Sequence, residues 1–113
     1  HLEKSRLVLT KEGQNYTVKI EDILYVEVFN HNLTYHCTKY DITAPGIMRK
    51  IENRLKEHGF VRVHNSYLVN MKFIERVQSQ SLILKDGTEL QLARSKKDAF
   101  RRTYLDFWGD ELG

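Results

Sequence analysis

Short runs of β-branched and aromatic residues, separated by brief polar breaks, recur along most of the chain and restrict it to a mainly β fold. The strongest run covers Ile23–Phe29, and the polar stretch 30–32 separates it from a returning run over 33–37. Connections this short suit antiparallel pairing. The other runs predicted as strands are 7–10, 16–20, 39–43, 60–64, 67–70, 73–77, 82–84 and 88–93.

One internal segment has helical periodicity. Ile47, Ile51 and Leu55 recur at every fourth position, which places them on one apolar stripe, and charged residues cover the opposite face. Pro45 suits the first turn of this helix, where its missing N–H would have no partner in any case. Gly59 is the expected stop, because glycine tolerates the left-handed conformation after a helix end.

A second helix is predicted over 96–108. Ser95 and Asp98 have the spacing of a capping-box variant, which would satisfy free N–H groups at the helix start. One stripe of this helix carries the aromatic residues Phe100, Tyr104, Phe107 and Trp108. The chain is therefore predicted to be mostly β, with antiparallel sheets, one internal helix and one C-terminal helix.

Composition fits a single soluble domain. The 113 residues are 41% hydrophobic and 29% charged, and a domain of this size can bury a core without disulfides or metals. No apolar run approaches the ~20 residues that span a bilayer. Cys37 is the one cysteine, so a reducing, cytoplasmic location is expected. Because the chain starts with His1, we expect residues 1–113 to be one domain of a larger protein, with 1–5 a linker or an expression remnant.

The sequence gives no support for catalysis. It contains no nucleophile-elbow serine motif, no phosphate-binding glycine loop and no zinc-protease motif, and we therefore predict neither an enzyme nor a cofactor. The candidate zinc ligands are His31, His36, Cys37 and His64. Their spacing matches no common zinc pattern, so no metal site is predicted.

The stretch 60–70, Phe-Val-Arg-Val-His-Asn-Ser-Tyr-Leu-Val-Asn, places polar residues between two apolar half-strands. One interpretation is a strand bend in which His64, Asn65 and Ser66 satisfy local backbone groups. The other is a surface corner that presents Asn65 to DNA, since an asparagine amide can pair with adenine through a donor and an acceptor.

Two more polar segments allow similar alternatives. Arg94, Lys96 and Lys97 lie at a strand-to-helix junction, where positive charge opposes the helix dipole unless an anion binds. They could equally form a solvated helix face. The stretch 30–32, Asn-His-Asn, is typical of a polar turn. Together, however, three polar or basic loops on a β scaffold indicate a binding surface. The net charge of +3 is too small to identify the partner by itself.

From about residue 20 to residue 105, the sequence resembles the LytTR family of bacterial DNA-binding domains. The matching segments are the acidic-apolar stretch 21–27, the internal helix, the stretch 60–70 that resembles the family hallmark, its continuation at 73–74, and the closing segment 86–90 followed by Arg94. The resemblance implies an elongated fold of short antiparallel sheets. It also implies that loops, rather than a recognition helix, enter the DNA grooves.

Site residues follow from this resemblance by position. His31 would approach one major groove, Asn65 would contact bases or phosphates, and the segment 94–97 would serve a second major groove. The supporting residues would be Asn30, Arg62, His64 and Ser66, with Arg62 and His64 ordering the loops. Because Ala93 stands where the family often has serine, the groove-reading residue remains open between Arg94 and Lys96.

The resemblance further implies double-stranded DNA as the partner. Because one domain of this size contacts a limited sequence, we expect repeated half-sites that a homodimer could occupy. The resemblance also implies a receiver or sensor domain N-terminal to this one, as in a two-component response regulator. The alternative is a mixed-β protein-interaction module that docks a partner at Phe107 and Trp108, although simple packing of the last helix would also explain these aromatic residues.

Overall fold

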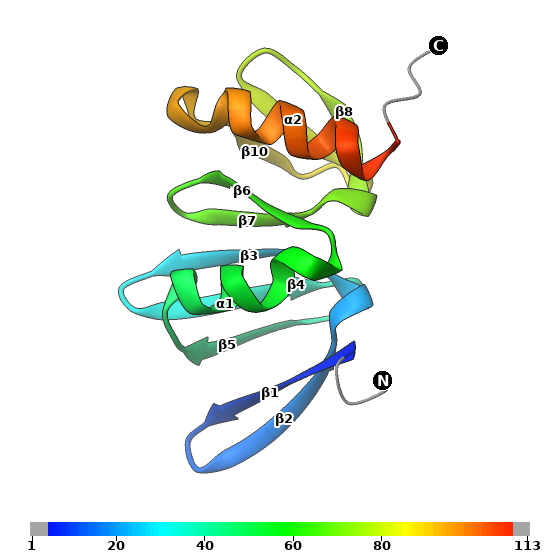
Figure 1. Cartoon of the computed structure of the whole chain (residues 1–113). Coiled ribbons are helices and arrows are strands. Elements are labelled where there is room, and N and C mark those ends of the chain that lie inside the picture. Colours follow the sequence, from blue (N-terminus) through cyan, green and yellow to red (C-terminus); the bar gives the residue numbers. More distant parts are fainter. Residues whose placement is uncertain (1–4, 110–113) are drawn as a thin grey trace.

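The computed structural model describes residues 5–109, which form a stack of three antiparallel sheets with two helices (Figure 1). The strands are β1 (Arg6–Lys11), β2 (Gln14–Lys19), β3 (Ile23–Phe29), β4 (Asn32–Cys37), β5 (Asp41–Pro45), β6 (Phe60–His64), β7 (Tyr67–Asn70), β8 (Ile74–Val77), β9 (Ser81–Leu84) and β10 (Glu89–Gln91). The helices are α1 (Met48–Leu55) and α2 (Lys97–Phe107). The predicted fold class, mostly β with an internal and a terminal helix, is confirmed.

The middle sheet has five strands in the order β5-β4-β3-β7-β6. α1 covers one of its faces and completes a core that contains Val26 and Leu33 from the sheet and Leu55 from the helix. Asn70, which is 2% exposed, links two strands of this sheet because its Nδ2 donates to the main-chain oxygen of Ile23 over 2.9 Å. The hairpin β1-β2 closes the same core from below with Leu7, Leu9 and Val18.

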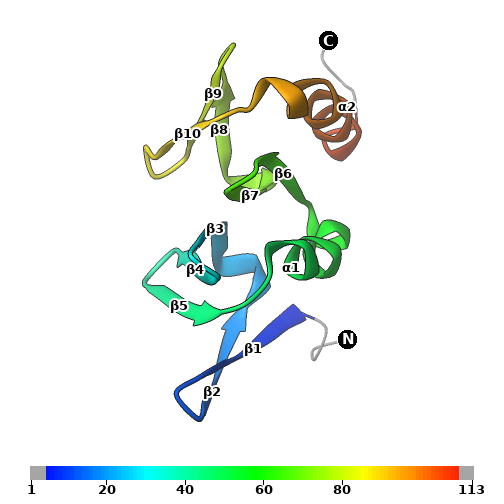
Figure 2. The same cartoon turned by 90° about the vertical axis from the view of Figure 1, so that its left-hand side faces the viewer.

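The third sheet, β10-β9-β8, forms a second core with α2. Phe100 of α2 is 2% exposed and packs with Leu82, Leu84 and Leu90 of the sheet and with Val63 of β6. Both helices lie on the same side of the stack (Figure 2). The result is an elongated molecule, with principal extents of 48 × 32 × 24 Å.

Several local expectations were wrong. Pro45 ends β5, paired opposite Asn32, and α1 begins only at Met48. Ile47 therefore precedes the helix and is 56% exposed instead of joining its apolar stripe. Ser95 lies within a 3-10 turn, Arg94–Lys96, and no side chain caps α2, because backbone bonds of this turn form the start of the helix.

Gly59 ends the first helical segment as predicted, with φ +87°. The absence of a Cβ at this position also leaves room for the ring of Phe107 from α2. The expected linker at residues 1–5 lies outside the described residues, except for Ser5. No helix within residues 5–109 is long and apolar enough to cross a membrane.

Candidate nucleic-acid interface

The three polar segments singled out in the sequence come together on one side of the molecule. The β3–β4 turn, the β6–β7 turn and the start of α2 follow one another along the left-hand side of Figure 1, and they face the viewer in Figure 2. Backbone hydrogen bonds fix this arrangement. Val28 N next to the first turn donates to Ser66 O in the second over 3.0 Å, and Ala93 N before α2 donates to Val63 O of β6 over 2.8 Å.

The β3–β4 turn is a rigid two-residue connection. Phe29 and Asn32 pair across the hairpin, and the two residues between them, Asn30 and His31, have φ values of 50° and 65°. Positive φ at both positions matches the twist of the flanking strands. Gly46 N donates to His31 O over 3.1 Å, which ties the turn to the start of α1. Asn30 and His31 are therefore exposed on a turn that is held in place.

The β6–β7 turn is held by a charged side chain. Arg62 Nε donates to the main-chain oxygen of His64 over 3.0 Å, and its Nη2 donates to that of Asn65 over 2.7 Å. Its Nη1 forms an ion pair of 2.7 Å with Glu52 of α1. His64 Nδ1 accepts a hydrogen bond from Ser66 N at 3.0 Å. Arg62 and His64 thus hold the turn by side-chain contacts to its backbone.

Asn65 differs from its neighbours in this turn. Its side chain is exposed and makes no hydrogen bond to another residue of the described chain, so its amide donors and acceptor face solvent. The bend interpretation therefore accounts for His64 but not for the Asn65 side chain. An amide held on a fixed turn without an internal partner can form hydrogen bonds to an external group.

The segment before α2 presents cations. Arg94 is exposed, while Lys96 and Lys97 are half-buried. Lys96 N donates to Ala93 O over 3.0 Å within the 3-10 turn that precedes α2. Within residues 5–109, none of these three side chains forms an ion pair. The segment therefore presents cations that form no ion pair within residues 5–109, although Asp98 follows in the first turn of α2. It lies on the same side of the molecule as the turn that carries Asn65.

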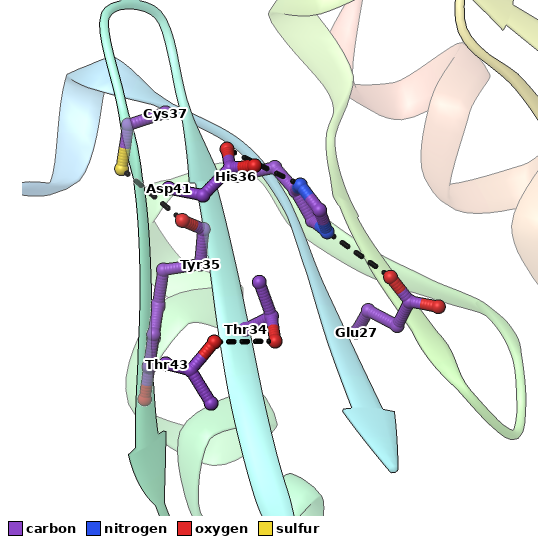
Figure 3. A network of polar contacts seen from close by, with 7 residues as sticks. All are labelled: Glu27, Thr34, Tyr35, His36, Cys37, Asp41 and Thr43. Atoms are coloured by element: carbon purple, nitrogen blue, oxygen red, sulfur yellow. Dashed lines mark hydrogen bonds and ion pairs between the residues drawn. The ribbon is translucent and has the colours of Figure 1, made fainter.

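A separate polar network lies on the face of the middle sheet opposite α1 (Figure 3). His36 lies between two carboxylates, with Nε2 at 3.0 Å from Glu27 and Nδ1 at 3.3 Å from Asp41, and its ring stacks on Tyr25 at a centroid distance of 4.2 Å. Burial, followed by the charge of Glu27, raises the pKa of Tyr25 to about 12. The sequence reasoning missed Glu27 and Asp41, because only the strand register brings them to His36.

The candidate zinc ligands do not gather at one place. Cys37 points to the other face of the sheet from His36, with its Sγ at 3.7 Å from the main-chain oxygen of Tyr35. Burial raises the pKa of Cys37 to about 11, which disfavours the thiolate that a metal requires. Residues 5–109 contain no group of three or more histidine, cysteine or acidic side chains arranged to hold a metal.

Comparison with known proteins agrees with these features. Residues 13–104 match the family model of the LytTr DNA-binding domain. The chain is 32% identical over 93 residues to the transcriptional regulatory protein LytR of Staphylococcus aureus, a match that covers 76% of this chain and 37% of that protein. It is 26% identical over 100 residues to the sensory transduction protein LytT of Bacillus subtilis, covering 84% of this chain and 42% of that protein.

A solved LytTr DNA-binding domain from Bacillus cereus has the same fold, with a TM-score of 0.76, 20% sequence identity, and coverage of 88% of this chain and 95% of that one. The matches to LytR and LytT span less than half the length of those proteins. Because the family model covers most of the chain, from residue 13 to residue 104, the chain belongs to the LytTr DNA-binding domain family.

Proposed function

We propose that this domain binds double-stranded DNA sequence-specifically through the side of the molecule formed by the β3–β4 turn, the β6–β7 turn and the start of α2. The observation that carries the proposal is the free amide of Asn65 on a fixed turn, beside cations that have no ion-pair partner among residues 5–109. Amide groups and cations can each contact base edges or phosphates, and the two together supply both specificity and affinity for DNA.

Each side chain has a distinct role in this proposal. Asn65 contacts bases or phosphates at the centre of the interface, and His31 approaches one major groove from the β3–β4 turn. Arg94 or Lys96 reads the second groove, and Lys97 contacts a phosphate. Asn30 and Ser66 support these contacts, while Arg62 and His64 keep the central turn in position.

The same proposal extends to the parent protein. Matches confined to part of the length of LytR and LytT support a domain that belongs to a larger regulator. We further propose that this regulator is cytoplasmic and carries a receiver or sensor domain N-terminal to this one. In a two-component system it would regulate transcription, bind repeated half-sites as a homodimer and carry no catalysis of its own. A single domain of this size contacts few base pairs, and repeated half-sites would provide the missing specificity.

The test is selection from a random duplex library, followed by quantitative binding to the enriched sequence. We expect a short repeated motif to be enriched, and we expect Asn65→Ala to reduce the ratio of specific to non-specific affinity about tenfold. Asn53→Ala, an exposed asparagine of α1, is the matched control and should bind like the wild type. Equal specificity ratios for Asn65→Ala and wild type would remove Asn65 from the proposed site.

The competing function is protein interaction through the C-terminal aromatic residues. Phe107 and Trp108 are 39% and 48% exposed, which favours this alternative. Phe107, however, packs against Gly59, and Trp108 packs edge-on against Phe107 at a centroid distance of 4.9 Å. A library without any enriched motif, together with a stable protein complex lost in Trp108→Ala, would favour the interaction module.

A further inference from the structure

A hollow of about 290 Å³ lies between the β8–β9 turn and the segment that joins β10 to α2. Its lining consists of Ser79, Gln80, Gln91, Leu92, Arg94 and Lys97. Every polar side chain of this set can donate a hydrogen bond, and none is a carboxylate. A hollow lined in this way favours an anion with several acceptor oxygens.

The two sides of the hollow are fixed to each other. Leu92 N donates to Gln80 O over 3.0 Å, and Gln78 N donates to Ser81 O over 2.8 Å to close the β8–β9 turn. Leu92 is 5% exposed and belongs to the upper core, so it anchors the wall formed by Gln91 and Arg94. The residues that line the hollow therefore belong to one backbone frame held by hydrogen bonds.

The charged residues that line the hollow itself are both cations. Arg94 and Lys97 have no ion-pair partner in the described part of the chain. Glu89 accepts a hydrogen bond from Ser81 Oγ at 2.7 Å. It does not line this hollow but lines a neighbouring one together with Ser79, Gln80 and Gln91. Two cations that share one hollow repel each other, and a bound anion would offset this repulsion.

We infer that this hollow binds one phosphate group of the DNA backbone, held by Arg94 and Lys97 together with the side-chain amides of Gln80 and Gln91, which leaves Lys96 as the residue that reads the second groove. The inference rests on the proposed function, because the hollow adjoins the start of α2. It adds the β8–β9 turn to the interface as a fourth contacting segment. Phosphate is the group that charged and amide donors recognise jointly along a DNA strand.

The experiment scans the selected duplex with single methylphosphonate substitutions, each of which removes one backbone charge. For the wild type we expect one position per half-site at which neutralisation weakens binding about tenfold. The double variant Gln80→Ala/Gln91→Ala should bind the unmodified duplex roughly three- to tenfold more weakly than the wild type. A methylphosphonate at that one position should then cause little further loss of affinity. We expect the double variant to fold, because both side chains are exposed and the main-chain oxygen of residue 80 can still accept its hydrogen bond from Leu92 N. Circular dichroism checks this.

Gln14→Ala, in the distant β1-β2 hairpin, is the control and should show the wild-type pattern. If the double variant is as sensitive as wild type at every position, the phosphate site is wrong even though specific DNA binding stands. If the wild type shows no sequence preference at all, the proposed function itself fails. A titration with inorganic phosphate, followed by NMR of the glutamine side-chain amides, distinguishes a site for free phosphate from a site for the DNA backbone. If inorganic phosphate saturates the site but no methylphosphonate substitution weakens DNA binding, the assignment to DNA is wrong.

Discussion

Arg62 Nη2 donates to the main-chain oxygen of Asn65 over 2.7 Å, so a single guanidinium fixes the backbone of the residue whose own side chain is free. The same guanidinium bonds His64 O and pairs with Glu52 of α1. The position of the Asn65 amide therefore depends on three contacts that span a turn and a helix. This arrangement predicts that Arg62 affects DNA binding through geometry rather than through its charge.

Arg62→Lys should weaken binding to the selected duplex about tenfold while leaving non-specific affinity nearly unchanged. Lysine keeps the charge but lacks the planar fork that reaches the two carbonyl oxygens and Glu52 together. Fluorescence anisotropy with specific and random duplexes measures both affinities. Arg76→Lys, at an exposed arginine of β8, is the matched control, and equal specific affinity in both variants would contradict the positioning role.

Lys97→Ala should weaken binding to every duplex and reduce the slope of log affinity against log salt by about one unit, as expected for one lost phosphate contact. Titrations at several salt concentrations give this slope directly. Lys56→Ala is the control. It removes an exposed lysine directly after the C-terminal end of α1, away from the start of α2, and it should leave the slope unchanged. A Lys97→Ala slope identical to that of the wild type would show that Lys97 touches no phosphate.

Asn70→Asp should destabilise the middle sheet by roughly 1–3 kcal/mol near neutral pH. The buried amide donates to Ile23 O, and a carboxylate of the same shape cannot donate. Below about pH 4 the introduced carboxyl becomes protonated and regains a donor, so the difference from wild type should shrink. Urea unfolding at pH 7 and pH 3.5 tests this, and a deficit that is the same at both pH values would show that the lost donor is not the cause.

The identities of most strands and of both helices could be predicted from sequence because periodicity is a local property. The turn at Asn30 and His31 and the stop at Gly59 were also accessible, since these residue types suit their backbone conformations. The start of α1 could not be predicted from the sequence, because pairing with Asn32 keeps Pro45 in β5.

Long-range contacts account for what sequence reasoning missed in the candidate site. Glu27 and Asp41 reach His36 only through strand register. Gln80 and Gln91 line one hollow because β9 pairs with β10, with Ser81 opposite Gln91 and Leu92 N bonded to Gln80 O. Neutral amides and serines carry no distinctive pattern in a sequence. The three segments with basic or turn-type residues were recognisable, whereas the segment formed by Ser79 and Gln80 was not.

Gly59→Ala should destabilise the domain more than Gly87→Ala, by roughly 1 kcal/mol. Both glycines have positive φ, +87° and +92°, so both substitutions introduce the same backbone strain. At Gly87 an added Cβ meets open space, whereas at Gly59 it would lie 2.8 Å from Phe107 Cε1. Urea unfolding measures the difference, which should disappear in a Phe107→Ala background. A difference that persists there would assign it to the backbone instead of the ring.

Alkaline pH should unfold the domain progressively between about pH 9 and pH 12. Burial raises the pKa of Tyr35 to about 12 and that of Cys37 to about 11, and burial with the charge of Glu27 raises the pKa of Tyr25 to about 12, from ordinary values of 10.0 for tyrosine and 9.0 for cysteine. A raised pKa means that the folded state holds its proton more tightly than the unfolded state. The resulting stabilisation is complete below the unfolded value and is lost as pH rises through the folded value.

Tyr35 provides the sharpest test of this alkaline loss, because it is 3% exposed and its side chain makes no hydrogen bond within residues 5–109. Its ionisation should cost on the order of 2 kcal/mol of stability by pH 12. Tyr35→Phe cannot ionise, so its urea midpoint should fall less steeply between about pH 10 and pH 12 than that of the wild type. Tyr16→Phe, at an exposed tyrosine of β2, is the control and should follow the wild-type curve. Parallel curves for Tyr35→Phe and wild type would place the alkaline loss in Tyr25 and Cys37.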